Sequence, residues 1–182
     1  MTTRQLVTTL VLLALLLLSW WGMRVGWEHR RRRTEDAAPA LPAVPDDPGP
    51  VTSGPFEAVY VSSTRAGDWL DRVVAHDLGV RSPAEVSVHA SGLVVRRTGA
   101  RDLFVPAASL RGATTAPGIA GKVVGRDGIV VVTWLPPGGD DERGLDTGLH
   151  PRRAADRDAL VAAVAALIPD TPAAQRGTQE KP

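Results

Sequence analysis

The chain has 182 residues, a formal net charge of +1 at pH 7 and no cysteine. The absence of cysteine excludes disulfides, Cys-ligated zinc and thiol nucleophiles. The small net charge conceals an asymmetry, because residues 24–33 hold five arginines against one glutamate, whereas basic and acidic residues balance over residues 55–182. A neutral domain beside a short basic segment does not have the charge profile of a nucleic-acid-binding protein.

An uncharged apolar segment opens the chain, because residues 5–23 contain no charged side chain. A membrane-spanning helix needs about 20 predominantly apolar residues, and we predict one over about residues 5–27, within an anchor region of residues 1–33. At its C-terminal boundary, tryptophans favour the headgroup layer and arginines attract anionic headgroups. The predicted membrane-anchoring residues are Trp20, Trp21, Arg24, Trp27, Arg30, Arg31, Arg32 and Arg33.

The arginines also predict an orientation. Arg4 precedes the apolar segment, whereas five arginines follow it. Because cytoplasmic flanks carry the excess of basic residues, we expect a single-pass protein of the inner (cytoplasmic) membrane, with its N-terminus outside and its C-terminal domain in the cytoplasm. One alternative is a cleaved signal peptide, although tryptophan and arginine occupy the zone where small residues are expected. A buried helix of a soluble protein is the other, but it would be shorter or amphipathic.

A proline-rich segment follows at residues 34–55, with six prolines and almost no large apolar side chain. Such a composition cannot bury enough apolar surface to fold, and it favours extended polyproline II structure. We therefore predict a spacer that holds the next domain clear of the bilayer, with a reach of about 68 Å at about 3.1 Å per residue.

From Phe56 onward, short apolar or alternating segments predict strands at residues 56–61, 85–90, 93–98, 103–105, 122–124, 129–135 and 145–149. Residues 69–78 fit either a strand or a short helix. The Gly-, Thr- and Pro-rich residues 112–121 indicate a loop. Residues 154–168 place apolar side chains on one helical face, and residues 170–182 are predicted to be a disordered tail.

Six or seven short strands followed by one helix predict a mainly β domain over residues 56–169, a small antiparallel barrel or sandwich capped by a C-terminal α-helix. Four segments carry a family resemblance: EVSVHASGLVVRR, LFVPAASLRG, GIAGKVVGRDGIVVVTW and LDTGL. They resemble the PH-like domain of actinobacterial single-pass membrane proteins. The resemblance implies a pleckstrin-homology-like fold of two near-orthogonal sheets with a helix at one end, and it implies no catalytic residues.

Several motifs look like sites but lack essential residues. Gly121-Lys122 is not followed by the Ser or Thr of a phosphate-binding loop. Asp146-Thr147-Gly148 spells the triplet of aspartic proteases, which need two facing carboxylates, and a strand-end turn explains it more simply. The three histidines of the domain have no metal-ligand spacing, and we interpret them as partly exposed surface residues: His76, His89 and His150.

Basic residues suited to a phosphoinositide are scarce. The predicted first hairpin offers only Arg65, whereas each phosphate needs paired cations. Arg96 and Arg97 are adjacent, so on a strand they would point to opposite faces. We interpret these two residues and Arg101 as a solvated edge balanced by Asp102.

The sequence therefore favours a membrane-tethered cytoplasmic PH-like interaction module, a scaffold or adaptor without catalytic activity. The expected partners are the lipid bilayer, with anionic headgroups at the arginine cluster, and an unidentified cytoplasmic protein bound along a sheet edge or beside the helix. No cofactor, metal or nucleic acid is expected. The first alternative is an accessory subunit of a transport, export or cell-envelope membrane complex, and the second is an enzyme with an unrecognised site.

Overall fold

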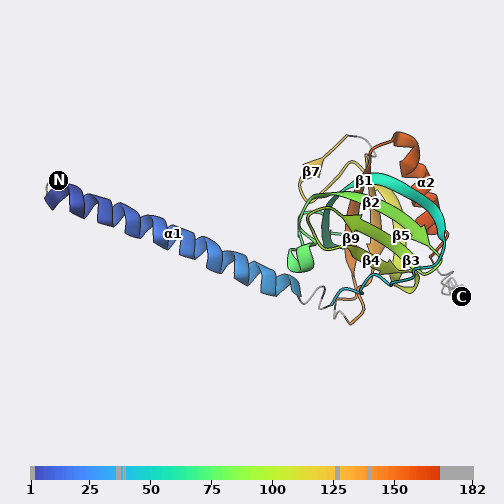
Figure 1. Ribbon diagram of the computed structural model, residues 1–182, viewed down its shortest axis with the longest axis horizontal. Helices are drawn as coiled ribbons and strands as arrows, with labels where there is room; N and C mark the ends of the chain where they lie inside the picture. The colour runs from blue at the N-terminus through green and yellow to red at the C-terminus, as the bar shows by residue number, and fades with distance from the viewer. Residues whose placement is uncertain (1–2, 36–37, 39, 126–127, 139–140, 169–182) are drawn as a thin grey trace, which may run out of the picture.

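The computed structural model describes residues 3–35, 38, 40–125, 128–138 and 141–168. A long helix, α1 (Thr3–Glu35), extends from a β-rich domain, and helix α2 (Ala154–Ala165) packs on the side of that domain away from α1 (Figure 1). The strands are β1 (Val51–Arg65), β2 (Ser82–His89), β3 (Gly92–Arg97), β4 (Leu103–Pro106), β5 (Leu110–Ala116), β6 (Gly118–Ile119), β7 (Lys122–Val123), β8 (Ile129–Trp134) and β9 (Leu145–Pro151). Two short 3-10 helices are η1 (Ala75–Asp77) and η2 (Ala107–Ser109). The predicted tail at residues 170–182 lies outside the described residues.

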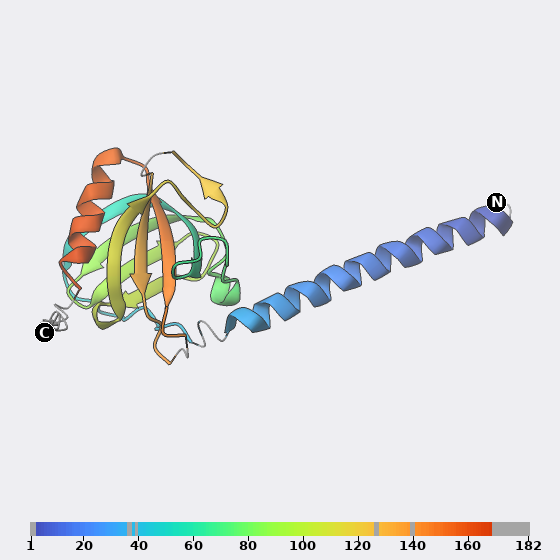
Figure 2. The ribbon, with the colours of Figure 1, turned by 180° about the vertical axis from the view of Figure 1, so that it is seen from behind.

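Seven strands form one antiparallel sheet in the order β4-β3-β2-β1-β9-β8-β5. Strand β1 joins its two halves, because it pairs with β2 on one side and with β9 on the other. Register shifts between Ser53 and Phe56, and between Tyr60 and Ser62, interrupt the ladders of β1, and such shifts bend a strand. The sheet therefore wraps around the core as a sandwich without closing into a barrel, and β4 and β5 are its edges (Figure 2). The predicted mainly β fold with a C-terminal helix is confirmed.

The core lies inside the wrapped sheet, where strands contribute every second side chain. Its largest fully buried side chains include Trp134, Tyr60, Leu78, Leu93, Leu103, Leu110, Leu145 and Leu149. Helix α2 covers one end of this core with Leu160 and Val164, both fully buried. These two residues belong to the apolar face that the helical periodicity predicts.

Two segments differ from the sequence predictions. Strand β5 occupies residues that the sequence predicts to be part of a loop. It is an edge strand and pairs with β8. An edge position tolerates glycine, and Gly112 lies at a register shift of this ladder. Residues 69–78 form neither a strand nor a regular helix, and the connection between β1 and β2 contains only η1 and an isolated bridge. Hydrogen bonds to residues elsewhere in the chain hold this connection in place, so no repeating local pattern of side chains predicts its conformation.

The proline-rich segment before β1 lies against the domain. Ala38 is fully buried, and its carbonyl oxygen lies 2.9 Å from Nε2 of His76 in η1. Farther along, the hydroxyl of Ser91 donates a hydrogen bond of 2.8 Å to the carbonyl oxygen of Pro48. Proline has no N–H but keeps its carbonyl as an acceptor, so polar side chains of the domain can hold this segment in place.

The structure corrects the free spacer expected over residues 34–55. Strand β1 already begins at Val51, and only residues 36–37 separate the end of α1 from buried Ala38. The domain is therefore held close to the C-terminal end of α1, and α1 contacts η1.

Candidate interaction site

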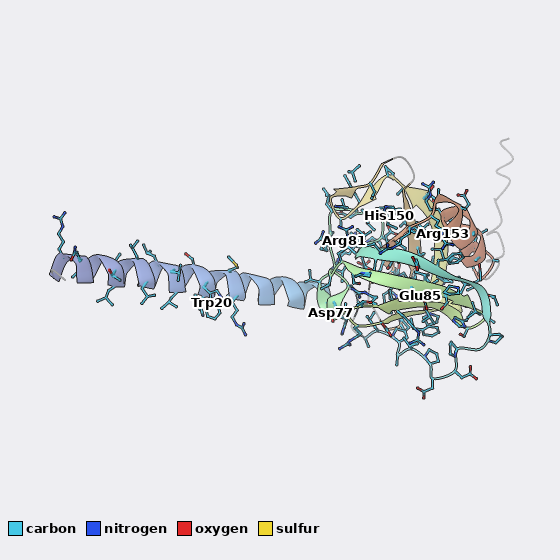
Figure 3. All side chains as sticks on the ribbon, turned by 45° about the horizontal axis from the view of Figure 1, so that its top comes forward. Trp20, Asp77, Arg81, Glu85, His150 and Arg153 are labelled. Atoms are coloured by element: carbon cyan, nitrogen blue, oxygen red, sulfur yellow. The ribbon has the colours of Figure 1, made fainter. Side chains whose placement is uncertain are left out.

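Helix α1 presents its predicted anchoring side chains to solvent. Trp20, Trp21 and Arg24 are exposed, and Figure 3 shows Trp20 directed away from the helix. Thr9–Gly26 is long and apolar enough to cross a membrane, and none of it is buried in the protein. A signal sequence would pass the same test. Trp27 and Arg30 to Arg33 belong to the C-terminal part of α1, and their side chains lie outside the described residues.

A charged surface crosses strands β1, β2 and β3 on the outside of the sheet. Glu57 lies opposite Glu85, and Glu85 lies opposite Arg96. Two adjoining cavities, of about 610 and 350 Å³, share Glu57 and Glu85 in their linings, and we call them together the charged trough. The charged side chains that line it from the outer face are Glu57, Glu85, Arg96, Asp102, Arg152, Arg153 and Asp156. The smaller cavity reaches the first turns of α2, so the trough extends beside the helix. Figure 3 labels Glu85 and Arg153, which line this cavity.

Ion pairs in the trough are long and incomplete. Arg152 Nε lies 4.0 Å from Glu57 Oε2, and Arg96 lies 3.8 Å from Asp102 through Nη1 and Oδ2. Such exposed pairs contribute only about 0–1 kcal/mol each. Within the described part of the chain, Glu85 has no ion pair, and it faces Glu57 directly. Like charges opposite one another destabilise a sheet, so a basic group placed between these two carboxylates would be favourable.

Arg97 corrects the interpretation of a solvated basic edge. It points to the opposite face from Arg96, as strand periodicity predicts, but it is only 7% exposed. Its guanidinium carbon lies 3.8 Å from the centre of the Tyr60 ring. Burial lowers the pKa of Arg97, and the nearby Tyr60, Asp77 and Asp102 oppose this shift. The guanidinium donates hydrogen bonds to the carbonyl oxygens of Asp77, Val80 and Arg101 and to the hydroxyl of Ser82.

Tyr60 also ends a buried chain of hydrogen bonds. Its hydroxyl donates to the carbonyl oxygen of Leu78 over 2.8 Å and lies 2.8 Å from Ser63 Oγ. Ser63 Oγ lies 2.7 Å from Thr147 Oγ1, to which Trp134 Nε1 donates over 2.9 Å. Because each hydroxyl has one proton, the donors run from Trp134 through Thr147 and Ser63 to Tyr60. Burial raises the pKa of Tyr60 to about 12, so this phenol stays protonated and serves the fold.

The triplet at residues 146–148 serves packing. Asp146 accepts a 2.6 Å hydrogen bond from the hydroxyl of Thr133 on β8. The β6–β7 hairpin lies over the outer face of the sheet, and a Cβ at Gly148 would come within 2.5 Å of Ile119 Cγ2. Glycine is therefore required by the close approach of the hairpin.

Gly121-Lys122, which resembles part of a phosphate-loop motif, lies at the tip of this hairpin.

The histidines have structural partners. His89 is only 5% exposed, so its interpretation as a surface residue is wrong. Its Nδ1 lies 2.8 Å from the carbonyl oxygen of Gly49, in the segment before β1. Burial, followed by the charges of Arg81 and Arg157, lowers the pKa of His150. Among the described residues, no three or more His, Asp or Glu side chains are grouped to hold a metal ion.

A wrapped antiparallel sheet closed at one end by a C-terminal helix defines the PH-like class of domain. The family model described as bacterial PH domain-like matches residues 38–165. The chain therefore belongs to the bacterial PH domain-like family, whose members are generally non-catalytic interaction modules. A search of curated proteins and a search of solved structures found no match. The family match begins at Ala38, which is fully buried.

Proposed function

We propose that the protein is a membrane-tethered PH-like interaction module without catalytic activity, and that α1 spans the bilayer. The observation that carries the proposal is the combination of a PH-like domain with a helix whose apolar stretch, Thr9–Gly26, is not buried in the protein. An exposed apolar surface of this extent is unfavourable in water and is expected to be covered by lipid or by another protein.

The charged trough is the proposed site for a protein partner. Glu57 and Glu85 are adjacent carboxylates at its centre, and arginines lie at both ends of the row. A polypeptide segment that places a lysine or arginine between the two carboxylates would relieve their repulsion. Its own acidic groups would then meet Arg96 or Arg152 at the ends.

Photo-crosslinking tests this site in the full chain. Benzoylphenylalanine at the position of Thr98, which is exposed and lines the trough, should give a discrete adduct in intact cells. The same group at Thr114, exposed on β5, is the matched control. Glu85→Lys should remove the adduct, whereas Glu142→Lys, an equal charge reversal outside the trough, should leave it. Equal adducts from Thr98 and Thr114, or an adduct insensitive to Glu85→Lys, would reject the trough as the site.

The proposed location is the cytoplasmic membrane, with the domain in the cytoplasm, supported by the arginines that follow the apolar segment. Because the chain has no natural cysteine, single cysteines at Thr2 and at exposed Ala90 give a clean test. In intact cells an impermeant maleimide should label Thr2→Cys but not Ala90→Cys. Labelling of Ala90→Cys alone would place the domain outside and remove cytoplasmic proteins as partners.

A further inference from the structure

Exposed apolar side chains gather at the end of the domain that faces α1. Among the described residues after α1, five large hydrophobic side chains are exposed, and four of them lie in the β1–β2 connection and on β7: Trp69, Leu70, Val80 and Val123. The two most exposed are Val123 at 66% and Leu70 at 64%. We call these four residues the apolar end patch. Strand β7 lies on the α1 side of the domain in both ribbon views, and Figure 3 shows Asp77 and Arg81, which flank Val80 in the chain, on the same side (Figures 1, 2 and 3).

The elements that carry the patch are fastened to one another. The N–H of Ala120, in the β6–β7 turn, donates a 2.7 Å hydrogen bond to the carbonyl oxygen of Trp69. Arg72 Nη2 donates to the carbonyl oxygen of the same Ala120 over 2.9 Å. Ile119 lies on the face of the β6–β7 hairpin that is buried against the sheet. Val123, on the other strand of the hairpin, is exposed. The part of the patch formed by Trp69, Leu70 and Val123 is therefore carried by two segments that are hydrogen-bonded to each other.

The position of α1 determines what this surface can meet. Gly26 ends the apolar stretch and Glu35 ends the helix, so at 1.5 Å per residue the helix extends about 14 Å beyond the hydrocarbon layer. The headgroup layer takes up roughly 5–8 Å of that distance. Only residues 36–37 then precede Ala38, which is already held at η1. If α1 spans the bilayer, the end of the domain beside η1 therefore lies close to the surface of the headgroup layer.

The charges around the patch do not oppose contact with lipid. Arg72, Arg81 and Lys122 are exposed beside it. Of the neighbouring acids, Asp71 pairs with Arg65 at 3.2 Å, and a carboxylate oxygen of Asp68 accepts N–H groups of its own turn. Asp77 is also exposed, so three acids lie among the three basic residues and the surroundings of the patch are close to neutral. Tryptophan and basic side chains are the residues that favour the membrane–water interface.

We propose that the apolar end patch is a second membrane contact, which docks the domain onto the headgroup layer of the bilayer that α1 spans. The inference rests on the proposed function only in requiring α1 to span the bilayer. Docking would fix the orientation of the domain at the membrane, because α1 and the patch are two separate points of contact. The charged trough, on the β1–β3 face, would then stay open to a partner.

Fluorescence quenching in nanodiscs of mixed phosphatidylcholine and phosphatidylglycerol tests the docking with the full chain. An environment-sensitive label is attached to Leu70→Cys, to Val123→Cys on the hairpin, or to Ala165→Cys, an exposed control on α2. A lipid with a nitroxide at its headgroup should quench the labels at positions 70 and 123 several-fold more than the label at position 165. Circular dichroism of each variant verifies that the exposed substitution leaves the fold intact.

A label at Leu15→Cys, on exposed α1, separates this inference from the proposed function. A nitroxide deep in the acyl chain should quench it strongly if α1 spans the bilayer. Quenching at position 15 with no difference among positions 70, 123 and 165 would overturn the docking and leave the tether intact. Absence of quenching at position 15 would overturn both. A blue-shifted label at position 70 that the nitroxide does not quench would mean that protein covers the patch, and would overturn the lipid assignment.

Discussion

The buried guanidinium of Arg97 provides the sharpest test of how this domain is held together. Arg97→Met keeps most of the apolar stem but removes the charge and all the donors. Three backbone carbonyl oxygens and one hydroxyl then lose their partner, and the stacking on Tyr60 is weakened. Leaving a buried acceptor without its partner costs about 1–3 kcal/mol. Because four acceptors are affected, we expect a loss of several kcal/mol, a large share of the roughly 5–15 kcal/mol that stabilise an ordinary domain.

Arg96→Met is the matched control, because it lies one residue away on the other face of β3. Its side chain is 61% exposed, and its ion pair with Asp102 measures 3.8 Å. Such a pair contributes about 0–1 kcal/mol, so we expect Arg96→Met to change the free energy of unfolding by less than about 1 kcal/mol.

Urea unfolding of the full chain in a mild non-ionic detergent, followed by circular dichroism of the β-sheet, measures both free energies. Arg97→Lys adds a third point, since it keeps a positive charge but lacks the planar fork of donors, and it should fall between wild type and Arg97→Met. If Arg97→Met and Arg96→Met lost the same free energy, the hydrogen bonds of Arg97 would not stabilise the fold and the reasoning would be wrong.

Two further predictions concern the hairpin and pH. Gly148→Ala places a methyl group against Ile119, so it should destabilise the domain by about 1–3 kcal/mol. In Gly112→Ala the new Cβ would meet its nearest atom at 3.8 Å, and we expect less than about 0.5 kcal/mol in the same urea assay; equal losses would contradict the packing argument. Because the folded pKa of His150 is lowered, the unfolded state binds the proton more readily, and this contribution to stability is present above the unfolded pKa of about 6.5 and declines as pH falls below it. Thermal unfolding between about pH 7.5 and 5.5 should show a shallower decline for His150→Gln than for wild type, and parallel declines would argue against the shift.

Local sequence patterns were sufficient for most of the regular elements, but not for the edge strand β5. The uncharged run at residues 5–23 identified α1, alternation identified strands such as β2 and β3, and the apolar stripe identified α2, because each pattern repeats within a few residues of the chain. The same periodicity correctly placed Arg96 and Arg97 on opposite faces. It could not say which of the two faces was buried.

Contacts between distant residues decided the rest. Arg97 is buried because the β1–β2 connection supplies acceptors for its guanidinium. The proline-rich segment is docked because His76 and Ser91 reach its carbonyl oxygens. The charged trough depends on the register that sets Glu57 against Glu85. Each of these features requires partners many residues apart in the chain, and only the tertiary structure determines which of them meet, because the free energy of such a contact depends on the folded surroundings and not on the neighbouring sequence.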